Sequence, residues 1–406
     1  MLRTFIVGLA ALGFALGAQA QTIKIAILGP MAFVQGENHW AGAEMARDEI
    51  NKAGGIKVGG KTMRVELVRA DTNEIASVPD ATNAIERVIT RDKVDFLIGG
   101  FRSEAVLAMQ EVAMDYKKLF LGVGAAHSKL GLNVEQNYER YKYWFRVAPT
   151  KDVDLARTLF AVMGSIGQQI RADLKTDTPK VAILAEKAVW TEGLIGAAQK
   201  TLPGPLKMEV VGLWQPSATA TDVTAELSAI ERSGAHIVFT MLSGPVGISV
   251  GRQMGERNMK AVAWGINVEG QKEEFWQAAA GKAQFVSTLD TYSEVEMTPK
   301  TIPFVRAFKE RFKKAPTYTA ATYDAIMLLK AVIEQEGTTN ADKLVAAIEK
   351  IEHVGTGSTA SWDKRHDLNW AVGKTAGIAV QWQDGQKVPF WPPDVKGMKP
   401  FKLPAR

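Results

Sequence analysis

Short apolar runs alternate with amphipathic stretches along the first third of the chain. The first run, from Ile23 to Leu28, is rich in β-branched residues and ends at Gly29-Pro30, which is typical of a buried strand. We expect further strands at 63–70, 94–98 and 119–123, and helices at 40–51, 79–91 and 103–116. Alternation of strand and helix patterns predicts a parallel sheet with helices on both of its faces.

A second set of the same kind begins after Ala148-Pro149. Its strands are expected at 180–184, 206–213, 236–241 and 261–264, and its helices at 152–163, 192–201, 223–233 and 246–256. Helices at 323–335 and 340–351, and a strand at 377–382 with a turn at Asp384-Gly385, follow. The tail is rich in proline from Pro389 onward, so we expect it to lie irregularly on the surface. The whole pattern predicts an α/β protein with two Rossmann-like lobes, each built on a parallel sheet.

The N-terminus has the pattern of a secretory signal. Arg3 is the only charged residue of the segment 1–20, and an apolar run from Phe5 to Leu16 ends at Ala18-Gln19-Ala20, with small residues where a signal peptidase cleaves. The run is too short for a comfortable transmembrane helix, although an uncleaved anchor is the alternative. We therefore expect residues 1–20 to be a cleaved signal peptide and the mature chain to be periplasmic.

Composition narrows the class of protein further. The chain has 406 residues, of which 46% are hydrophobic, so it is long enough for two domains with sizeable cores. It has no cysteine, which excludes disulfides, thiolate metal sites and lipid attachment through a cysteine. Its 49 basic and 44 acidic residues are scattered along the chain, so we expect no nucleic-acid partner.

The chain lacks the signatures of an enzyme or of a cofactor site. Residues Gly55 to Thr62 formally match the phosphate loop G-x-x-x-x-G-K-[ST], but that loop must join a strand to a helix. Here the segment follows a helix pattern and precedes a strand pattern, so we interpret it as a helix end and a tight turn. The five histidines show no metal-ligand spacing, and no G-x-S-x-G elbow occurs. We expect neither a cofactor nor a metal, and an enzyme would require observed turnover of a ligand.

The loops after the predicted strands are the expected ligand site, because open parallel sheets bind ligands at the carboxyl ends of their strands. In the loop Gly99 to Ser103, Ser103 offers a hydroxyl and a helix N-terminus, which together suit a carboxylate. Arg102 would add a charge-assisted hydrogen bond. The alternatives are that Ser103 only caps its helix and that Arg102 pairs with a surface acid.

Further candidates follow other strands. Ala125 and Ala126 lie in a run of small residues that can offer backbone groups to a ligand, or that forms a plain strand–helix junction. Trp190 would supply a flat aromatic wall, or would pack in the core. Asn267 and Glu269 follow the strand at 261–264, where Glu269 would receive an ammonium group or remain a solvated loop acid.

Several segments together resemble a known family. They are Ile23 to Pro30, Gly42 to Ile56, Val94 to Gly100 and Thr322 to Ala325. The resemblance is to the type I periplasmic binding proteins of the branched-chain amino acid (leucine/isoleucine/valine) group, and it covers essentially the whole mature chain. It implies two lobes joined by a three-stranded hinge, with the ligand closed between them. It also implies a non-enzymatic receptor that delivers its solute to an ABC permease.

The same resemblance implies roles for particular residues. Ser103, Ala125 and Ala126 occupy the places that hold a ligand carboxylate, and Ser243 falls near a second-lobe contact. The amino-acid binders commonly have Thr or Ser near Ala126, and an aromatic residue where Gln35 stands. These two departures weaken the amino-acid interpretation. The acid that binds an α-amine would fall near Asn267 or Glu269, and because no clear amine-binding acid is found there, the alternative is a carboxylate without an α-amine, such as an aromatic acid, or a small amide.

The sequence thus leads to a specific set of expectations. The first lobe comprises residues 21–147 and 288–353, and the second comprises residues 148–287 and 354–406. The protein is expected to be a monomer that captures a small carboxylate-bearing solute, either an amino acid or an aromatic or aliphatic acid, by closure of a hinge. The alternative is a ligand-sensing receptor of the same fold for amides or related small molecules.

Overall fold

The first lobe is built on a six-stranded sheet in the order β2-β3-β1-β4-β5-β6. The computed structural model describes residues 21–405, so the predicted signal peptide lies outside the described residues. All neighbouring strands of this sheet are parallel except β2 and β3. Its elements up to the first crossing are β1 (Thr22–Gly29), α1 (Val34–Lys52), β2 (Ile56–Val58), β3 (Lys61–Asp71), α2 (Val78–Thr90), β4 (Phe96–Gly99), α3 (Ser103–Asp115), β5 (Phe120–Val123), α4 (Lys129–Gln136), α5 (Tyr138–Tyr141) and β6 (Trp144–Ala148).

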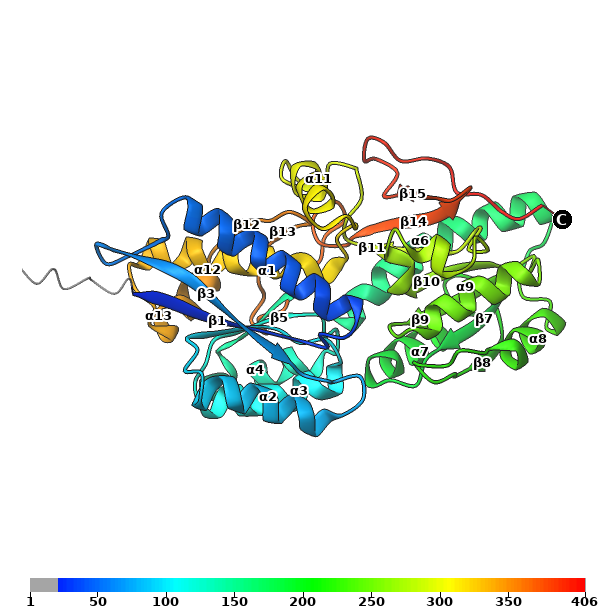
Figure 1. Cartoon of the computed structure of the whole chain (residues 1–406). Helices are drawn as coiled ribbons and strands as arrows, with labels where there is room; N and C mark the ends of the chain where they lie inside the picture. Colours follow the sequence, from blue (N-terminus) through cyan, green and yellow to red (C-terminus); the bar gives the residue numbers. More distant parts are fainter. Residues whose placement is uncertain (1–20, 406) are drawn as a thin grey trace, which may run out of the picture.

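Later segments of the chain complete this lobe. They are α11 (Thr301–Phe312), η2 (Tyr318–Ala321), α12 (Thr322–Glu336), α13 (Ala341–Ile348), β12 (His353–Val354) and β13 (Thr359–Ala360). Helix α12 packs beside α1 on one face of the sheet, and α2 packs beside α3 on the other (Figure 1). Because both faces are covered, strands such as β1 and β4 are buried along nearly their whole length. The prediction of a parallel sheet between helix layers is confirmed.

The glycine-rich segment that matched the phosphate loop forms a hairpin. Strand β2 pairs antiparallel with the start of β3, from Ile56 opposite Met63 to Val58 opposite Lys61. Gly59 and Gly60 form the turn with φ values of +51° and +83°, a region that glycine adopts readily. The segment therefore does not open a helix, which a phosphate loop requires.

The second lobe repeats the plan with a parallel sheet in the order β10-β9-β7-β8. An antiparallel sheet, β11-β14-β15, adjoins it through a bridge between Ala263 and Val286. Its elements are α6 (Asp152–Leu174), β7 (Lys180–Ala185), α7 (Val189–Thr201), β8 (Glu209–Trp214), α8 (Thr224–Arg232), β9 (Ile237–Leu242), α9 (Val246–Glu256), β10 (Val262–Asn267), η1 (Glu269–Gln271), α10 (Phe275–Ala278), β11 (Ser287–Asp290), β14 (Ile378–Gln383) and β15 (Gln386–Trp391).

Alternate residues of β7 show how the second sheet is covered on both faces. Val181 and Ile183 pack in a cluster with side chains of α6 and α7. Ala182 and Leu184 pack in another cluster with side chains of α8 and α9. Successive side chains of a strand point to opposite faces, so a short run of apolar residues supplies both cores.

The chain crosses between the lobes three times: after β6, after β11 and before β14 (Figure 1). The boundaries expected at 147/148, 287/288 and 353/354 stay a prediction. Core packing would move the third of them, because Ala360, Trp362 and Leu368 belong to the apolar cluster of the first lobe. In the described part of the chain, no helix combines the length and the apolar character needed to span a membrane.

Three local expectations are wrong. Helix α6 continues to Leu174 instead of ending at residue 163, because Ile166 and Ile170 extend its buried face. Helix α1 begins at Val34 rather than at residue 40, because buried contacts of Gln35, Asn38 and His39 hold a turn whose sequence alone is a weak helix former. The tail also contains a regular strand, since β15 pairs antiparallel with β14 and includes Pro389. Strand β15 lies at the edge of its sheet, where a proline without an N–H is tolerated.

We expect the stability of the first lobe to depend on the protonation of His39. Its imidazole is fully buried and contacts the Val123 carbonyl through Nε2 at 2.6 Å. Burial lowers the pKa of His39 from 6.5 to about 4. The unfolded chain therefore takes up a proton between these two values that the folded chain does not, and the unfolding free energy should fall by about 3 kcal/mol as the pH falls across this window.

The variant His39→Gln tests this dependence, because it keeps a donor for Val123 but does not titrate. Burial raises the pKa of Asp324 to about 6, which opposes the histidine effect as the pH falls, so variant and wild type must be compared directly. Urea unfolding at pH 7 and pH 4.5 should show a smaller loss of unfolding free energy in His39→Gln than in the wild type. Equal losses would show that His39 is not the responsible group.

Candidate functional site

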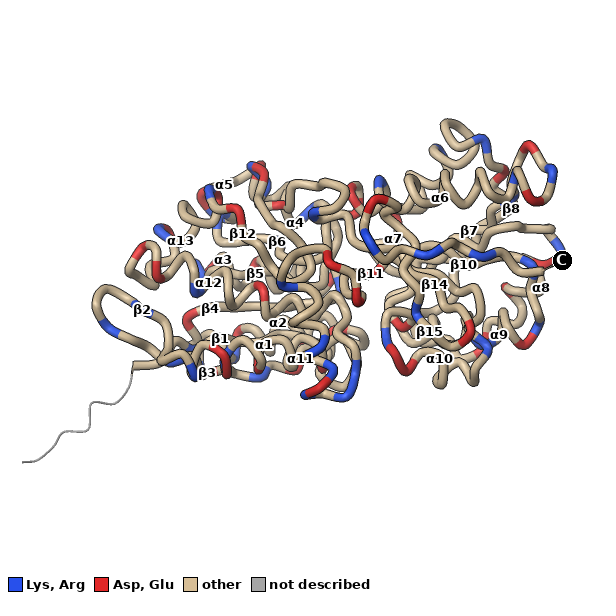
Figure 2. The backbone as a smooth tube through the Cα atoms, turned by 90° about the horizontal axis from the view of Figure 1, so that it is seen from above, with Lys and Arg blue, Asp and Glu red and all other residues tan. Residues whose placement is uncertain are grey.

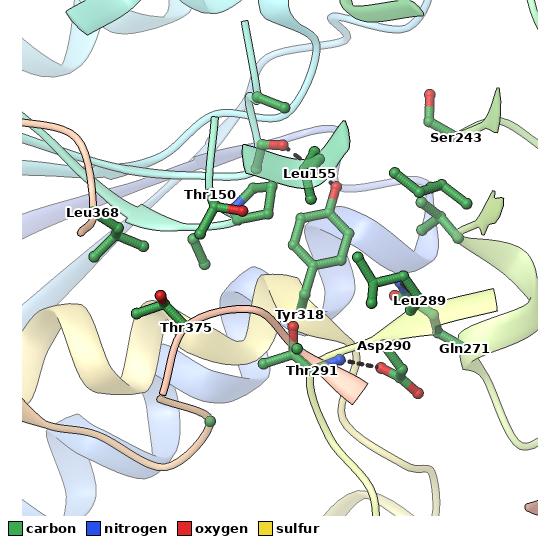
Figure 3. Close-up of a pocket in the computed structure, with 18 of the residues that line it drawn as sticks. Thr150, Leu155, Ser243, Gln271, Leu289, Asp290, Thr291, Tyr318, Leu368 and Thr375 are labelled. Carbon is green, nitrogen blue, oxygen red and sulfur yellow. Dashed lines mark hydrogen bonds between the residues drawn. The ribbon is translucent and has the colours of Figure 1, made fainter. Parts of the chain in front are cut away.

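A cavity lies between the lobes where the three crossings meet (Figure 3). Residues of each crossing line it, including Pro149, Thr291 and Ala376. Its volume is about 870 Å³, counting the part that is open to solvent. A cavity bounded by all three connections would change shape if the lobes moved about them.

The wall of the cavity is largely apolar. Its main apolar side chains are Phe101, Leu155, Trp190, Ile266, Leu289 and Tyr318. Tyr318, from η2, lies in the centre of the close-up, and its hydroxyl donates to the Gly124 carbonyl at 3.4 Å (Figure 3). Burial, with a further effect of the Glu186 charge, raises the pKa of Tyr318, so the ring remains a neutral surface at ordinary pH. An apolar wall with a few placed polar groups is typical of a small-molecule site.

Glu186 forms the centre of a buried polar cluster beside the cavity, whose wall includes Arg102, Trp190 and Ser243. It directly follows β7, and its Oε2 accepts from the backbone N–H groups of Ser243 and Gly244 at 2.8 and 2.9 Å. Its Oε1 accepts from the Ser243 hydroxyl and from Trp190 Nε1, the latter at 3.2 Å. Arg102 of the first lobe donates to the same oxygen at 2.9 Å. Glu186 therefore joins the two lobes through a buried ion pair.

The guanidinium of Arg102 also contacts Glu104, at 2.9 Å from Nε and 2.8 Å from Nη2. The prediction that Arg102 lies at the site is consistent with its place in the cavity wall. The alternative, that Arg102 pairs with a surface acid, describes its contact with the partly exposed Glu104, but a buried acid of the other lobe is a partner as well. One positive charge is thus shared between two carboxylates.

Glu74 fixes the backbone of the loop before α3. Its Oε2 accepts from the N–H groups of Phe101 and Arg102 at 2.9 and 2.7 Å, and its Oε1 accepts from the Thr72 hydroxyl at 2.7 Å. Burial raises the pKa of Glu74. Two backbone donors of the loop are therefore occupied within the protein, and what the loop presents to a ligand is the start of α3.

Ser103 lines the cavity but does not act as the N-cap that we expected. Arg102 holds the N-cap position, and Ser103 is the first residue of the helix. The Ser103 hydroxyl instead accepts from the His127 N–H at 3.3 Å. This contact ties α3 to the loop after β5, so that the helix N-terminus and the loop share one wall of the cavity.

A buried ion pair holds the loop after β5 in place. Arg146 and Asp367 are both fully buried, with 2.6 Å between Arg146 Nε and Asp367 Oδ1. The same guanidinium donates to the carbonyls of Ala125 and His127, the latter at 3.0 Å. Ala126 lines the cavity, whereas Ala125 turns its carbonyl toward Arg146.

The remaining predicted site residues lie in different places. Ser243 lines the cavity, and its backbone carbonyl accepts from Gln35 Nε2 at 3.1 Å across the two lobes. Gln35 is thus a contact between the lobes rather than part of the cavity wall. Asn267 bonds to Gly247 and Gly270, and Glu269 pairs with Lys272 at 2.6 Å. Neither Asn267 nor Glu269 belongs to the wall.

The acid that does line the cavity is Asp290, at the end of β11. Its carboxylate accepts from Lys387 Nζ at 2.6 Å and from the Thr291 N–H at 2.7 Å. It is 2% exposed, so its charge is compensated within the protein. Among residues 21–405 no cluster of histidines and acids is arranged to hold a metal ion.

Sequence reasoning missed Glu186, Tyr318 and Gln271. Glu186 follows a predicted strand, so the rule about strand ends pointed to its loop but gave no reason to choose it over its neighbours. Tyr318 and Gln271 lie in short 3-10 segments that carry no periodic signal. Their positions in the cavity depend on how the lobes face each other.

The two α/β lobes, with an apolar cavity where three crossings meet, define a two-lobed ligand-binding protein. The sequence model described as "Periplasmic binding protein" matches residues 22–386. The chain belongs to this periplasmic binding protein family.

Individual relatives cover most of the chain. An amino acid binding protein of Pseudomonas aeruginosa is 25% identical over 375 residues, which span 90% of this chain and 91% of the relative. A leucine-specific-binding protein of Salmonella typhimurium is 24% identical over 376 residues, which span 90% and 93%. Both relatives are named as binding proteins.

Solved structures share the fold. The branched-chain amino acid transporter substrate binding protein LivJ of Streptococcus pneumoniae, in complex with isoleucine, has a TM-score of 0.75 at 20% identity and covers 94% of this chain and 100% of that chain. A solute binding protein of an ABC transporter from Rhodopseudomonas palustris, in complex with p-hydroxybenzoic acid, has a TM-score of 0.73 at 20% identity, with coverage of 95% and 98%. Another from R. palustris, in complex with benzoate, has a TM-score of 0.70 at 20% identity, with coverage of 91% and 95%. These likenesses establish the fold of the chain.

Proposed function

We propose that this chain is the extracytoplasmic solute-binding protein of an ABC importer and that it captures a small carboxylate-bearing solute with an apolar body. The observation that carries the proposal is the largely apolar cavity between the lobes, with Ser103 and the N-terminus of α3 in its wall. Backbone N–H groups at a helix N-terminus favour a negative group. The apolar side chains would cover the rest of the solute.

The solute would lack an α-amine. An ammonium group needs a carboxylate that is not already compensated, and Asp290 in the cavity wall is held by Lys387. Glu269, which the sequence suggested for this role, is paired with Lys272 outside the wall. Aromatic and aliphatic acids therefore suit the cavity better than amino acids do.

Hinge closure would trap the solute in the cavity. The lobes contact each other at Arg102 and Glu186, and at Gln35 and Ser243. A solute that touches both walls adds its own contacts to these, which shifts the lobes toward the closed form. We propose that a membrane permease recognises this closed monomer in the periplasm. Lys and Arg are interspersed with Asp and Glu over both lobes (Figure 2), which supports the expectation of no nucleic-acid partner.

A second candidate is a ligand-sensing receptor for amides. The observation in its favour is that Arg102 already contacts Glu104 and Glu186, so this part of the cavity wall carries no excess positive charge for an anion. A neutral amide would meet no repulsion there. The two candidates differ in the charge of the polar group that the cavity prefers.

A thermal-shift series on the mature protein separates these functions, because a ligand that binds only the folded state raises the melting temperature. Benzoate, benzamide and isoleucine form the series, since the first two differ only in the charged group. A shift with benzoate but not with benzamide supports the acid-binding function. A shift with benzamide alone supports the amide receptor, and a shift with isoleucine alone restores an amino-acid ligand. Release of a reaction product from a bound ligand would overturn the non-enzymatic assignment.

Ser103→Ala should weaken the binding of the acid by about 1–3 kcal/mol, because a polar partner at the cavity wall is lost. The measurement is a calorimetric titration of wild type and variant with the acid that gives the largest thermal shift. Ser233→Ala is a matched control, since the Ser233 hydroxyl donates to the Ile230 carbonyl in the second lobe, outside the cavity wall. Unchanged affinity in Ser103→Ala would remove Ser103 from the site.

Trp190→Ala should weaken benzoate more than acetamide, by roughly tenfold or more, because the indole supplies apolar area that only the ring can cover. Trp190→Phe separates the contribution of the aromatic surface from that of the indole hydrogen bond. It keeps an aromatic surface but loses the hydrogen bond from Nε1 to Glu186. Equal losses for benzoate and acetamide in Trp190→Ala would show that Trp190 is only structural.

A further inference from the structure

Gln271 presents a buried acceptor that the protein leaves without a partner. It is the last residue of η1, is 4% exposed and lines the cavity. Its Nε2 donates to the Leu289 carbonyl at 2.9 Å, and no described residue donates to its Oε1. Because the Leu289 carbonyl can only accept, Nε2 must face it. The contact therefore fixes which end of the amide remains free.

The neighbouring donor side chains make hydrogen bonds to other acceptors. Lys387 Nζ donates to the backbone carbonyl of Gln271 and to Asp290 Oδ2, both at 2.6 Å. Trp382 Nε1 donates to the Gly270 carbonyl at 2.8 Å. Figure 3 shows Gln271 beside Leu289 at the cavity, away from Thr150 and Leu368. The Oε1 is therefore free to accept a hydrogen bond from a molecule in the cavity that Gln271 lines.

We propose that Gln271 is a specificity-determining residue that accepts a hydrogen bond from a donor group of the solute. This inference rests on the proposed function and adds to it the chemistry of the other end of the solute. Ser103 belongs to the first lobe and Gln271 to the second, so a solute held between them has its carboxylate at one wall and its donor at the other. The solute is then an apolar acid with a hydroxyl or N–H group distant from its carboxylate.

The contact also depends on lobe closure. Gln271 reaches a solute bound at the first lobe only when the second lobe covers it, so the hydrogen bond forms in the closed state. A solute without the donor leaves a buried acceptor unsatisfied on closure, which lowers its affinity relative to a hydroxylated analogue. Discrimination between two otherwise identical acids is therefore the direct readout.

Calorimetric titration of benzoate, 3-hydroxybenzoate and 4-hydroxybenzoate with wild type and Gln271→Met tests the proposal. In the wild type, one of the hydroxy acids should bind about tenfold more tightly than benzoate. In Gln271→Met, which has a similar volume and no acceptor oxygen, this ratio should fall to about one while benzoate itself still binds. Ratios within one variant do not depend on the fraction of folded protein.

Gln253→Met provides a matched control, because Gln253 is also a buried glutamine of the second lobe but bonds to Val223 and lies outside the cavity wall. It should keep the ratio of the wild type. If wild type and Gln271→Met show the same ratio, the role of Gln271 is overturned while the acid-binding function stands. If the wild type binds none of the three acids, the proposed function fails for aromatic acids, and the role of Gln271 falls with it.

Discussion

Glu186→Gln should lower the free energy of unfolding by about 1–3 kcal/mol, which is the usual cost of leaving a buried donor without its acceptor, since Arg102 keeps Glu104 as a counterion. Glu186 is fully buried and receives hydrogen bonds from Arg102, Trp190, Ser243 and Gly244. An amide has only one acceptor oxygen. Its NH2 group would face donors on one side, so at least one buried donor would lose its partner.

The variant should also weaken ligand binding. Arg102 reaches across the lobes to Glu186, and without this charge the guanidinium is attracted only to Glu104 on its own lobe. The closed arrangement then loses a contact that the open arrangement does not have. We expect a lower affinity for any solute that needs closure, because the closed form is a smaller fraction of the protein.

Glu104→Gln is the matched control for this prediction. Its carboxylate contacts the same guanidinium, but the side chain is 27% exposed and lies on the same lobe as Arg102. Its loss should cost no more than about 1 kcal/mol, the usual range for a partly solvated pair. Chemical unfolding of both variants measures the difference. Equal effects would mean that Glu186 does not anchor the cluster.

The fold could be predicted because its signals are local. Most strands of the two sheets are short apolar runs between turn residues, and burial on both faces is what removes the polar alternation, whereas β3 and β8 are only partly buried. Each strand that was predicted for these sheets lies within a few residues of its observed place, whereas β2 and β6 were not predicted. The first turn of α1 could not be predicted, because buried contacts of Gln35 and His39 hold it rather than helix propensity. Strand β15 was missed because Pro389 is acceptable only at the edge of a sheet.

The site could be predicted only in part, because local sequence signals do not show how side chains from distant segments meet. Ser103, Ala126 and Trp190 were found because each follows a strand closely, and strand ends gather at one edge of a sheet. Asn267 satisfied this rule as well, yet it is turned to Gly247 and Gly270. A sequence pattern gives the edge at which a residue lies but not the direction of its side chain. Residues from the other lobe, such as Tyr318 opposite Trp190, carry no such signal.

The ion pair between Arg146 and Asp367 leads to the second large prediction. Arg146→Met should lower the free energy of unfolding by about 3–5 kcal/mol, because it leaves the fully buried carboxylate of Asp367 without a counterion. The nearest remaining cation is Lys151, whose Nζ is 4.0 Å from Asp367 Oδ2. Chemical unfolding of the variant measures the loss.

The double variant Arg146→Met/Asp367→Leu separates stability from the shape of the site. Removing both charges takes away the unpaired carboxylate, so most of the lost stability should return. Affinity for the acid should remain low, because the carbonyls of Ala125 and His127 still lack the donor that positions the loop. A double variant as unstable as the single one would contradict the ion-pair explanation. Recovery of affinity together with stability would show that Arg146 supports the fold without positioning the wall that faces the solute.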